Sequence, residues 1–176
     1  FFFNAMNTLR SIISSEKKAD GIDFVEKMSQ VYRYILESET NDTVTIAAEM
    51  EFVKAYVHLL KKRFGGGLNI SIDVDKQVQK LRMPPMALQT LIENAVKHNK
   101  LASSSPVTLK IENDENYLYI KNSVNKKDGS SGHGRGLANL NKRYTMIAGK
   151  PIEIIPGPGE FIVKLPLITA PFDIRE

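Results

Sequence analysis

The sequence has no cysteine and no tryptophan. Without cysteine it can form no disulfide, no thiolate metal site and no cysteine nucleophile, which suits a reducing compartment such as the cytoplasm. Without tryptophan, and with no basic run interleaved with aromatic residues, nothing in it indicates nucleic-acid binding. It also lacks any apolar stretch of the roughly 18 residues that a membrane helix needs. Its 176 residues, 42% hydrophobic and 25% charged, have the composition of a folded globular protein.

The charge balance is mildly basic, with a formal net charge of +4 and a pI of about 9.2. Such a small positive excess favours an anionic ligand, for example a nucleotide. The chain opens on Phe1 instead of methionine, already inside an amphipathic pattern. We therefore expect it to be part of a longer protein.

Helical periodicity dominates the first third of the chain. Apolar residues recur at spacings of three and four from Phe1 to about Ser15, and again from Phe24 to Leu36, which predicts a helical hairpin. A third helix is predicted to begin near Thr45, a good N-cap, and to end at the glycines 65–67. The apolar stripes of these helices are expected to form core or a dimer surface.

From Leu68 onward the spacing changes to two, as in a strand with one buried face. A helix is predicted from Pro84-Pro85 to about His98, because proline fits a first helical turn. Strands are predicted over 107–111, 117–122, 152–155 and 161–165, with a loop over 125–136 and a helix over 137–147. This order predicts an α+β fold in which helices cover one face of a mixed sheet.

The helix after Pro85 has one apolar and one polar side. The apolar side, which must face the sheet, consists of Leu88, Leu91, Ile92, Ala95 and Val96. On the polar side, a step of about 100° per residue brings Asn94, Lys97 and His98 into one sector. An amide oxygen can coordinate Mg²⁺, and the two basic side chains can meet phosphate charge. A solvated helix face, with its cations favoured by the helix dipole, accounts for the same residues equally well.

A second candidate site is the glycine-rich segment from Gly132 to Asn139, which precedes the predicted helix at 137–147. Glycines allow close backbone approach to a ligand, and a helix N-terminus attracts phosphate oxygens. A flexible loop is the alternative interpretation. The spacing matches neither a P-loop nor a dinucleotide-binding fingerprint.

Other chemistries have less support in the sequence. The three histidines include no pair at metal-ligand spacing, and His58, between Val57 and Leu59, is predicted to be structural. The serines lack the Gly-x-Ser-x-Gly elbow of serine hydrolases.

Several motifs together resemble one family. They are, in chain order, Phe1-Phe2-Phe3-Asn4-Ala5-Met6-Asn7, Tyr32-Arg33-Tyr34, Arg63-Phe64, Pro84-Pro85, Glu93-Asn94-Ala95-Val96-Lys97-His98 and Gly132 to Asn139. Seen together they resemble LytS-type sensor histidine kinases, over nearly the whole chain to about Ile168. The resemblance implies the GHKL-type ATP-binding fold, shared with gyrase and MutL.

The resemblance also implies roles for individual residues. Asn94 would ligate Mg²⁺, and Lys97 and His98 would contact the phosphates of ATP. Gly132, Gly134 and Gly136, followed by Leu137, would form a phosphate-facing lid hinge, and Asn139 and Arg143 would support it. Glu93 would position or polarise the acceptor imidazole, or add negative charge beside the metal.

The chain departs from the family pattern at two places. Asn122 stands where these kinases usually carry an aspartate that accepts a hydrogen bond from the adenine amino group. Its amide oxygen can still accept that bond, although without charge assistance. The phospho-accepting histidine of the family would lie one residue before Phe1, so it is not in this chain.

By this likeness we expect a helical dimerisation region over 1–44, a connecting helix over 45–67, an ATP-binding domain over 68–168 and a tail over 169–176. Expected partners are a second copy, giving a homodimer, and a response regulator, with no nucleic acid. The upstream part is expected in the bacterial inner membrane and this part in the cytoplasm. The alternatives are a nucleotide-binding pseudo-kinase and a gyrase-type ATP switch. Thr90 disfavours the switch, because a gyrase-type enzyme has a water-activating glutamate there.

Overall fold

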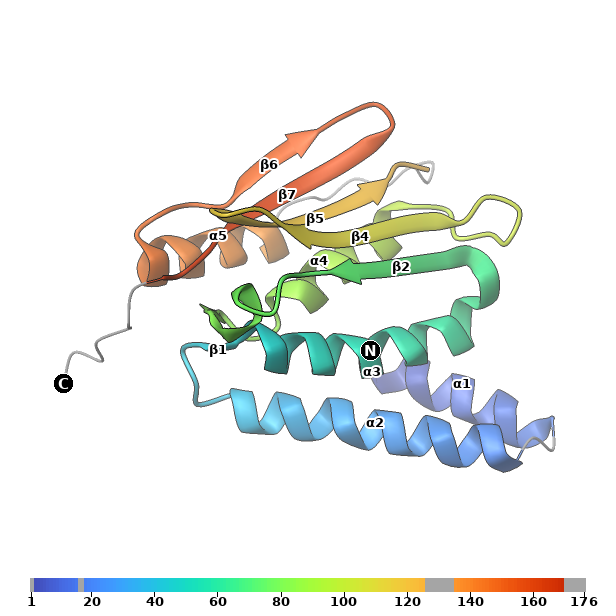
Figure 1. Ribbon diagram of the computed structural model, residues 1–176. Helices are drawn as coiled ribbons and strands as arrows, with labels where there is room; N and C mark the ends of the chain where they lie inside the picture. The colour runs from blue at the N-terminus through green and yellow to red at the C-terminus, as the bar shows by residue number, and fades with distance from the viewer. Residues whose placement is uncertain (1, 16–17, 126–134, 170–176) are drawn as a thin grey trace.

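A computed structural model describes residues 2–15, 18–125 and 135–169. It has three layers, seen in Figure 1 as a sheet at the top, helices beneath it and a helical hairpin at the bottom. Helices α3, α4 and α5 pack against one face of the sheet, and the hairpin packs against α3. This arrangement confirms the predicted fold class of a hairpin followed by an α+β sandwich.

The hairpin consists of α1 (Phe2–Ser14) and α2 (Lys18–Ser38). Phe24 and Val31 of α2 are buried, whereas several large apolar side chains of the hairpin are exposed. Polar contacts that connect α2 to α3 include two ion pairs: Asp23 Oδ2 lies 2.6 Å from His58 Nε2, and Asp20 Oδ1 lies 2.8 Å from Lys62 Nζ. The contact with Asp23 agrees with a structural role for His58.

Helix α3 (Ile46–Phe64) begins and ends where its sequence signals predict. The Thr45 hydroxyl caps its start by accepting a hydrogen bond from the Ala48 N–H at 3.2 Å. Gly65, with φ of 57°, ends it and leads into a short 3-10 turn, Gly65–Gly67. Because α3 contacts α2 on one side and β2 and α4 on the other, it connects the hairpin to the α+β unit. The division into 1–44, 45–67 and 68–168 stays a prediction.

The main sheet has five strands in the order β2-β4-β5-β7-β6. The strands are β2 (Leu68–Asp73), β4 (Val107–Asn113), β5 (Tyr117–Ser123), β6 (Glu153–Pro156) and β7 (Glu160–Pro166). Among the strand pairs of the described residues in this sheet, only β2–β4 is parallel. Along β5, Leu118, Ile120 and Asn122 are buried in alternation, so Asn122 shares the face that the helices cover.

Besides the 3-10 turn at Gly65–Gly67, three short elements were not predicted. Strand β1 (Val44–Thr45) pairs antiparallel with β3 (Arg82–Met83), and a 3-10 turn, Val78–Lys80, lies between β2 and β3. Arg82 Nε donates to Thr43 Oγ1 at 2.7 Å. These contacts hold the start of α3 beside the segment that leads into α4.

Helix α4 spans Ala87–His98, so the prediction that Pro84-Pro85 forms its first turn is wrong. Met86, with φ of 61°, lies in the left-handed region and separates the prolines from the helix. The physical reason lies in α3, because the Glu49 carboxylate accepts hydrogen bonds from the N–H groups of Met86 and Leu88, both at 3.0 Å. That long-range cap sets where α4 starts.

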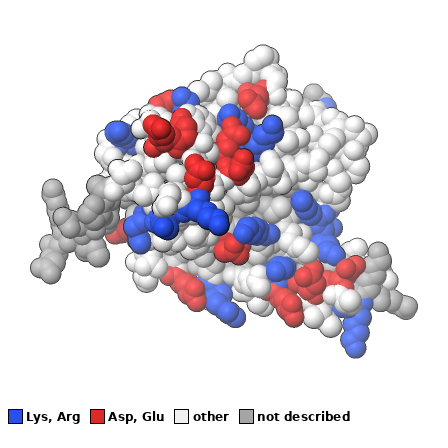
Figure 2. Space-filling view, in the orientation of Figure 1, with Lys and Arg blue, Asp and Glu red and all other residues white. Residues whose placement is uncertain are grey.

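Helix α5 (Arg135–Ala148) begins two residues before the predicted Leu137. The predicted loop over 125–136 lies mostly outside the described residues, which stop at Asn125 and resume at Arg135. In the ranges 2–15, 18–125 and 135–169, no helix has both the length and the apolar content to cross a bilayer. Figure 2 shows acidic and basic side chains interspersed over the face that it draws.

The stability of the core under the sheet should depend on the buried side chains of α4. Ile92 is fully buried, and Ile92→Ala should lower the free energy of unfolding by about 2–5 kcal/mol in urea denaturation. As a matched control, Met146→Ala removes an apolar side chain of α5 that is 84% exposed and should change stability by less than about 0.5 kcal/mol. Equal effects of the two variants would contradict this packing.

Candidate nucleotide site

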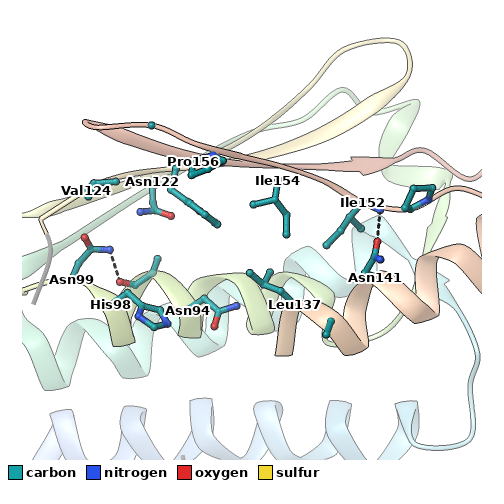
Figure 3. Close-up of a pocket in the computed structure, with 15 residues that line it drawn as sticks. Asn94, His98, Asn99, Asn122, Val124, Leu137, Asn141, Ile152, Ile154 and Pro156 are labelled. Atoms are coloured by element: carbon teal, nitrogen blue, oxygen red, sulfur yellow. Dashed lines mark hydrogen bonds between the residues drawn. The ribbon is translucent and has the colours of Figure 1, made fainter. Parts of the chain in front are cut away.

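A cavity of about 750 Å³ lies between α4 and α5 on one side and the β5–β7–β6 part of the sheet on the other (Figure 3). This volume is within the range of small-molecule sites. The lining residues are Asn94, Ala95, His98, Asn99, Asn122, Val124, Leu137, Ala138, Asn141, Pro151, Ile152, Ile154, Pro156, Gly157 and Phe161. The lining combines apolar walls with four amides and one imidazole.

Asn94 lies on the cavity side of α4. Its Nδ2 atom is buried and has no hydrogen-bond partner among the described residues. Gly136 faces this position from the first turn of α5: a Cβ there would lie 3.3 Å from Thr90 Cγ2 and 3.9 Å from Asn94 Nδ2. A side chain at position 136 would therefore press on Thr90 and push the N-terminus of α5 away from Asn94.

His98 and Asn99 line the end of the cavity near the C-terminus of α4. Asn99 is buried, donates from Nδ2 to the carbonyl of Ala95 at 2.8 Å, and accepts from the Asn125 N–H at 2.6 Å. It therefore connects the end of α4 to the segment after β5. Lys97 is exposed and does not line the cavity, so of the predicted trio only Asn94 and His98 do.

Asn122 lies across the cavity, on β5. It is only 6% exposed, and its Nδ2 donates to the carbonyl of Ser123 at 2.9 Å. Figure 3 shows its side chain pointing into the space between the sheet and α4. This bond uses one of the two N–H groups of the amide, and the carboxamide oxygen is the part of the side chain that can accept a hydrogen bond from a ligand.

Glu93 is turned away from the cavity. Its Oε1 accepts hydrogen bonds from the Tyr56 hydroxyl of α3 and from Gln89 Nε2, both at 3.0 Å. Burial, followed by the nearby Glu93 carboxylate, raises the pKa of Tyr56, so its hydroxyl stays protonated as a donor. Glu93 therefore faces α3, on the hairpin side of α4.

The residues predicted on the lid side are placed in different ways. Leu137 is buried and lines the cavity, whereas Asn139 is exposed and does not. Arg143 also lies off the cavity, and its Nη1 donates to the carbonyl of Pro85 at 2.9 Å. Gly132 and Gly134 lie outside the described residues.

Sequence reasoning missed several lining residues. Asn141 follows Leu137 by four residues on α5, so helical spacing could have found it; its Oδ1 accepts from the Ile152 N–H at 2.9 Å (Figure 3). Ile152, Ile154 and Phe161 come from the β6–β7 region and carry no chemical signal of their own.

The described lining residues include no charged side chain, neither carboxylate nor lysine or arginine. An anionic ligand would therefore meet no acidic repulsion in this cavity. No group of three or more histidine and acidic side chains that could hold a metal lies together in the described part of the chain. A metal ion here would depend on an amide oxygen such as that of Asn94, on the ligand and on water, as Mg²⁺ sites commonly do.

Comparison with known proteins points to one group. Residues 1–68 match the family model described as histidine kinase. Sensor protein LytS of Staphylococcus epidermidis is 30% identical over 168 residues, covering 85% of this chain and 28% of the relative. Sensor histidine kinase/phosphatase LytS of Staphylococcus aureus is 30% identical over 173 residues, which cover 85% of this chain and 29% of the relative. This chain thus spans less than a third of the length of these relatives.

The solved structures that match are less alike in sequence. The catalytic domain of histidine kinase ThkA is 15% identical, covers 70% of this chain and 94% of that chain, and has a TM-score of 0.46. Acinetobacter baumannii histidine kinase AdeS is 14% identical, covers 94% of each chain, and has a TM-score of 0.48.

The Asn141 contact should hold the segment before β6 at the cavity wall. Asn141→Ala leaves the Ile152 N–H without its acceptor and should cost about 1–2 kcal/mol in the free energy of unfolding. Hydrogen exchange of the Ile152 amide should become faster. Lys142→Ala, at the exposed neighbouring position, should change neither quantity. An unchanged exchange rate of the Ile152 amide in Asn141→Ala would contradict this role of Asn141.

Proposed function

Since the chain belongs to the LytS-type sensor histidine kinases, we propose that its cavity binds Mg-ATP for phosphorylation of a histidine just upstream of Phe1. In the intact protein the phosphoryl group would then pass to an aspartate of a response regulator. The observation that carries the proposal is the cavity with Asn94 of α4 on one side and Asn122 of β5 on the other.

The apolar part of the cavity is suited to an adenine ring. Ala95, Leu137, Ile152 and Phe161 contribute its apolar walls. Asn122 supplies an acceptor for the exocyclic amino group of adenine, weaker than the carboxylate usual in the family. Adenine selectivity therefore rests on a neutral hydrogen bond.

Asn94 and the start of α5 are suited to the phosphates. The Asn94 Nδ2 atom is buried and has no hydrogen-bond partner among the described residues, and Gly136 brings the first turn of α5 close to it. Unpaired N–H groups at a helix N-terminus attract phosphate oxygens. Mg²⁺, when bound, supplies neutralisation of phosphate charge. We propose His98 as a further phosphate contact, Lys97 as one at the rim, and Gly132 and Gly134, which directly precede α5, as its phosphate-facing glycines.

Glu93 is proposed to position the acceptor imidazole. Tyr56 and Gln89 hold its carboxylate on the hairpin side of α4, away from the cavity. Phosphoryl transfer needs mainly positioning and charge neutralisation, so the domain requires no covalent intermediate of its own.

The position of Thr90 supports transfer to a side chain over hydrolysis. Its hydroxyl donates to the carbonyl of Met86 at 2.9 Å, one turn before Asn94. A hydroxyl so occupied, in place of a glutamate, is not a base for activating water.

The hairpin is proposed to form the homodimer. Its large exposed apolar side chains are Phe2, Phe3, Ile13, Ile22, Val25 and Leu36, and Phe3 is 82% exposed. Ile13, Ile22 and Val25 line one hollow of the hairpin, and exposed apolar surface of this kind indicates a protein interface. The response regulator remains the proposed acceptor of the phosphoryl group.

Binding should depend on both the metal and Asn94. An ATP analogue should bind in calorimetry only when Mg²⁺ is present, and Asn94→Ala should weaken it by at least about tenfold, or about 1.4 kcal/mol. Binding that is equal with and without the metal would contradict the proposed site.

A matched pair on β6 controls for the position of the ligand. Ile154 and Ile155 are 43% and 42% exposed, yet only Ile154 lines the cavity. Ile154→Ala should weaken binding by about fivefold, or about 1 kcal/mol, while Ile155→Ala should not.

In this proposal, kinase activity needs an acceptor histidine placed before Phe1. With a histidine restored before Phe1, labelled ATP and Mg²⁺ should place phosphate on that histidine, and Asn94→Ala should reduce the labelling in parallel with binding. A dimer that binds Mg-ATP yet leaves the histidine unlabelled would instead be a nucleotide-binding pseudo-kinase.

A further inference from the structure

Glu49 of α3 is a carboxylate buried where hairpin, α3 and α4 meet. Its side chain is 0% exposed, and both of its oxygens accept hydrogen bonds. Oε2 accepts from the Tyr34 hydroxyl of α2 and, at 3.0 Å, from the Met86 N–H, while Oε1 accepts from the Leu88 N–H at 3.0 Å. One carboxylate thus joins α2, α3 and α4.

The two backbone contacts determine where α4 begins. Met86 is the one residue other than glycine with positive φ in the described part of the chain, and such a conformation persists only when its surroundings enforce it. A carboxylate at a helix N-terminus also interacts favourably with the helix dipole. Because α4 is a rigid helix, a shift at Leu88 moves Asn94, which lies about 9 Å further along the axis.

Arg143 connects α5 to the segment at the start of α4 that Glu49 also contacts. Its Nη1 donates to the carbonyl of Pro85 at 2.9 Å, next to Met86. Burial raises the pKa of Glu49, while the positive charge of Arg143 and the three hydrogen bonds oppose that rise. Helix α5 contributes Leu137, Ala138 and Asn141 to the cavity wall. Both helices that line the cavity, α4 and α5, are therefore held at the segment around Pro85 and Met86.

The hairpin contacts Glu49 through the Tyr34 hydroxyl group. The Tyr34 ring stacks on Phe52 of α3 with centroids 4.4 Å apart, and its hydroxyl donates to Glu49. Tyr34 is the last residue of the Tyr32-Arg33-Tyr34 motif, and Pro85 belongs to the Pro84-Pro85 motif. Neither motif contributes to the cavity lining. Tyr34 donates to Glu49, and Pro85 directly precedes Met86, whose N–H also donates to Glu49.

We propose that the Tyr34–Glu49 hydrogen bond is the joint through which the hairpin sets the position of α4 and α5, making Tyr34 and Glu49 positioning residues for phosphoryl transfer. This proposal rests on the proposed function for its kinetic consequence. Its structural part, the control of the α4 start by Tyr34, holds independently of any activity.

The test uses the full-length dimeric protein with Tyr34→Phe, which keeps the stacked ring and removes only the hydroxyl. Rates of histidine phosphorylation at saturating Mg-ATP should fall by about tenfold to a hundredfold, because small misplacements have effects of that size. The affinity for Mg-ATP should change by less than about threefold, because Glu49 still accepts both backbone hydrogen bonds most of the time and only their transient opening becomes more frequent. Glu49→Gln should weaken binding and lower the rate, because one of the two N–H groups loses its acceptor.

The matched control is Tyr119→Phe. The Tyr119 hydroxyl also donates to a carboxylate, that of Asp114, but on the exposed face of the sheet, where this bond raises the pKa of Tyr119 to about 12. This variant should keep the wild-type rate and affinity. A Tyr34→Phe protein with the wild-type rate, or with rate and affinity reduced together by the same factor, would overturn the joint.

Hydrogen exchange without nucleotide separates this inference from the proposed function. The Leu88 amide should exchange faster in Tyr34→Phe than in wild type and in Tyr119→Phe, at a temperature at which all three remain folded. If the wild-type protein binds no nucleotide but the Leu88 amide still exchanges faster in Tyr34→Phe, the proposed function is wrong and the role of the Tyr34–Glu49 hydrogen bond is supported. If the wild-type protein is active but the exchange rate of the Leu88 amide is the same in Tyr34→Phe, the Tyr34–Glu49 hydrogen bond does not control the start of α4.

Discussion

The packing of α4 between the sheet and α3 is the constraint on which the rest of the structure depends. Leu88, Leu91, Ile92 and Ala95 are buried, and their spacing leaves one orientation of the helix. That orientation turns Asn94 and His98 toward the cavity and Glu93 toward α3. One helix thereby separates the proposed nucleotide contacts from the residue proposed to meet the acceptor histidine.

Among the described residues, the lining has no acidic, lysine or arginine side chain, so the proposed site depends on position more than on charge. Its polar lining is made of amides and one imidazole, and the walls come from α4, α5 and the β6–β7 end of the sheet. Such a cavity holds its shape only if the helices that form it are fixed relative to each other. Glu49 and Arg143 provide fixed points at the start of α4 and along α5, where the hairpin also makes contact.

Much of the fold could be predicted because each element carries a local signal. Thr45 caps α3, the glycines after Phe64 end it, and the alternation in β4 and β5 matches their buried faces. The start of α4 could not be predicted in this way. Its cap comes from Glu49, nearly forty residues earlier, and no local pattern at Pro84-Pro85 reports a carboxylate supplied by another helix.

The sequence by itself determined the order of elements, the two sides of α4 and the residue types available for a polyphosphate site, because periodicity and capping are local properties of the chain. Only the tertiary structure decided which polar residues share a space. Asn94 and Asn122 lie on different elements and face one cavity, whereas Lys97, next to His98, lies outside it. Contacts between distant segments depend on how helices pack on a sheet, and that packing is not written in any single segment.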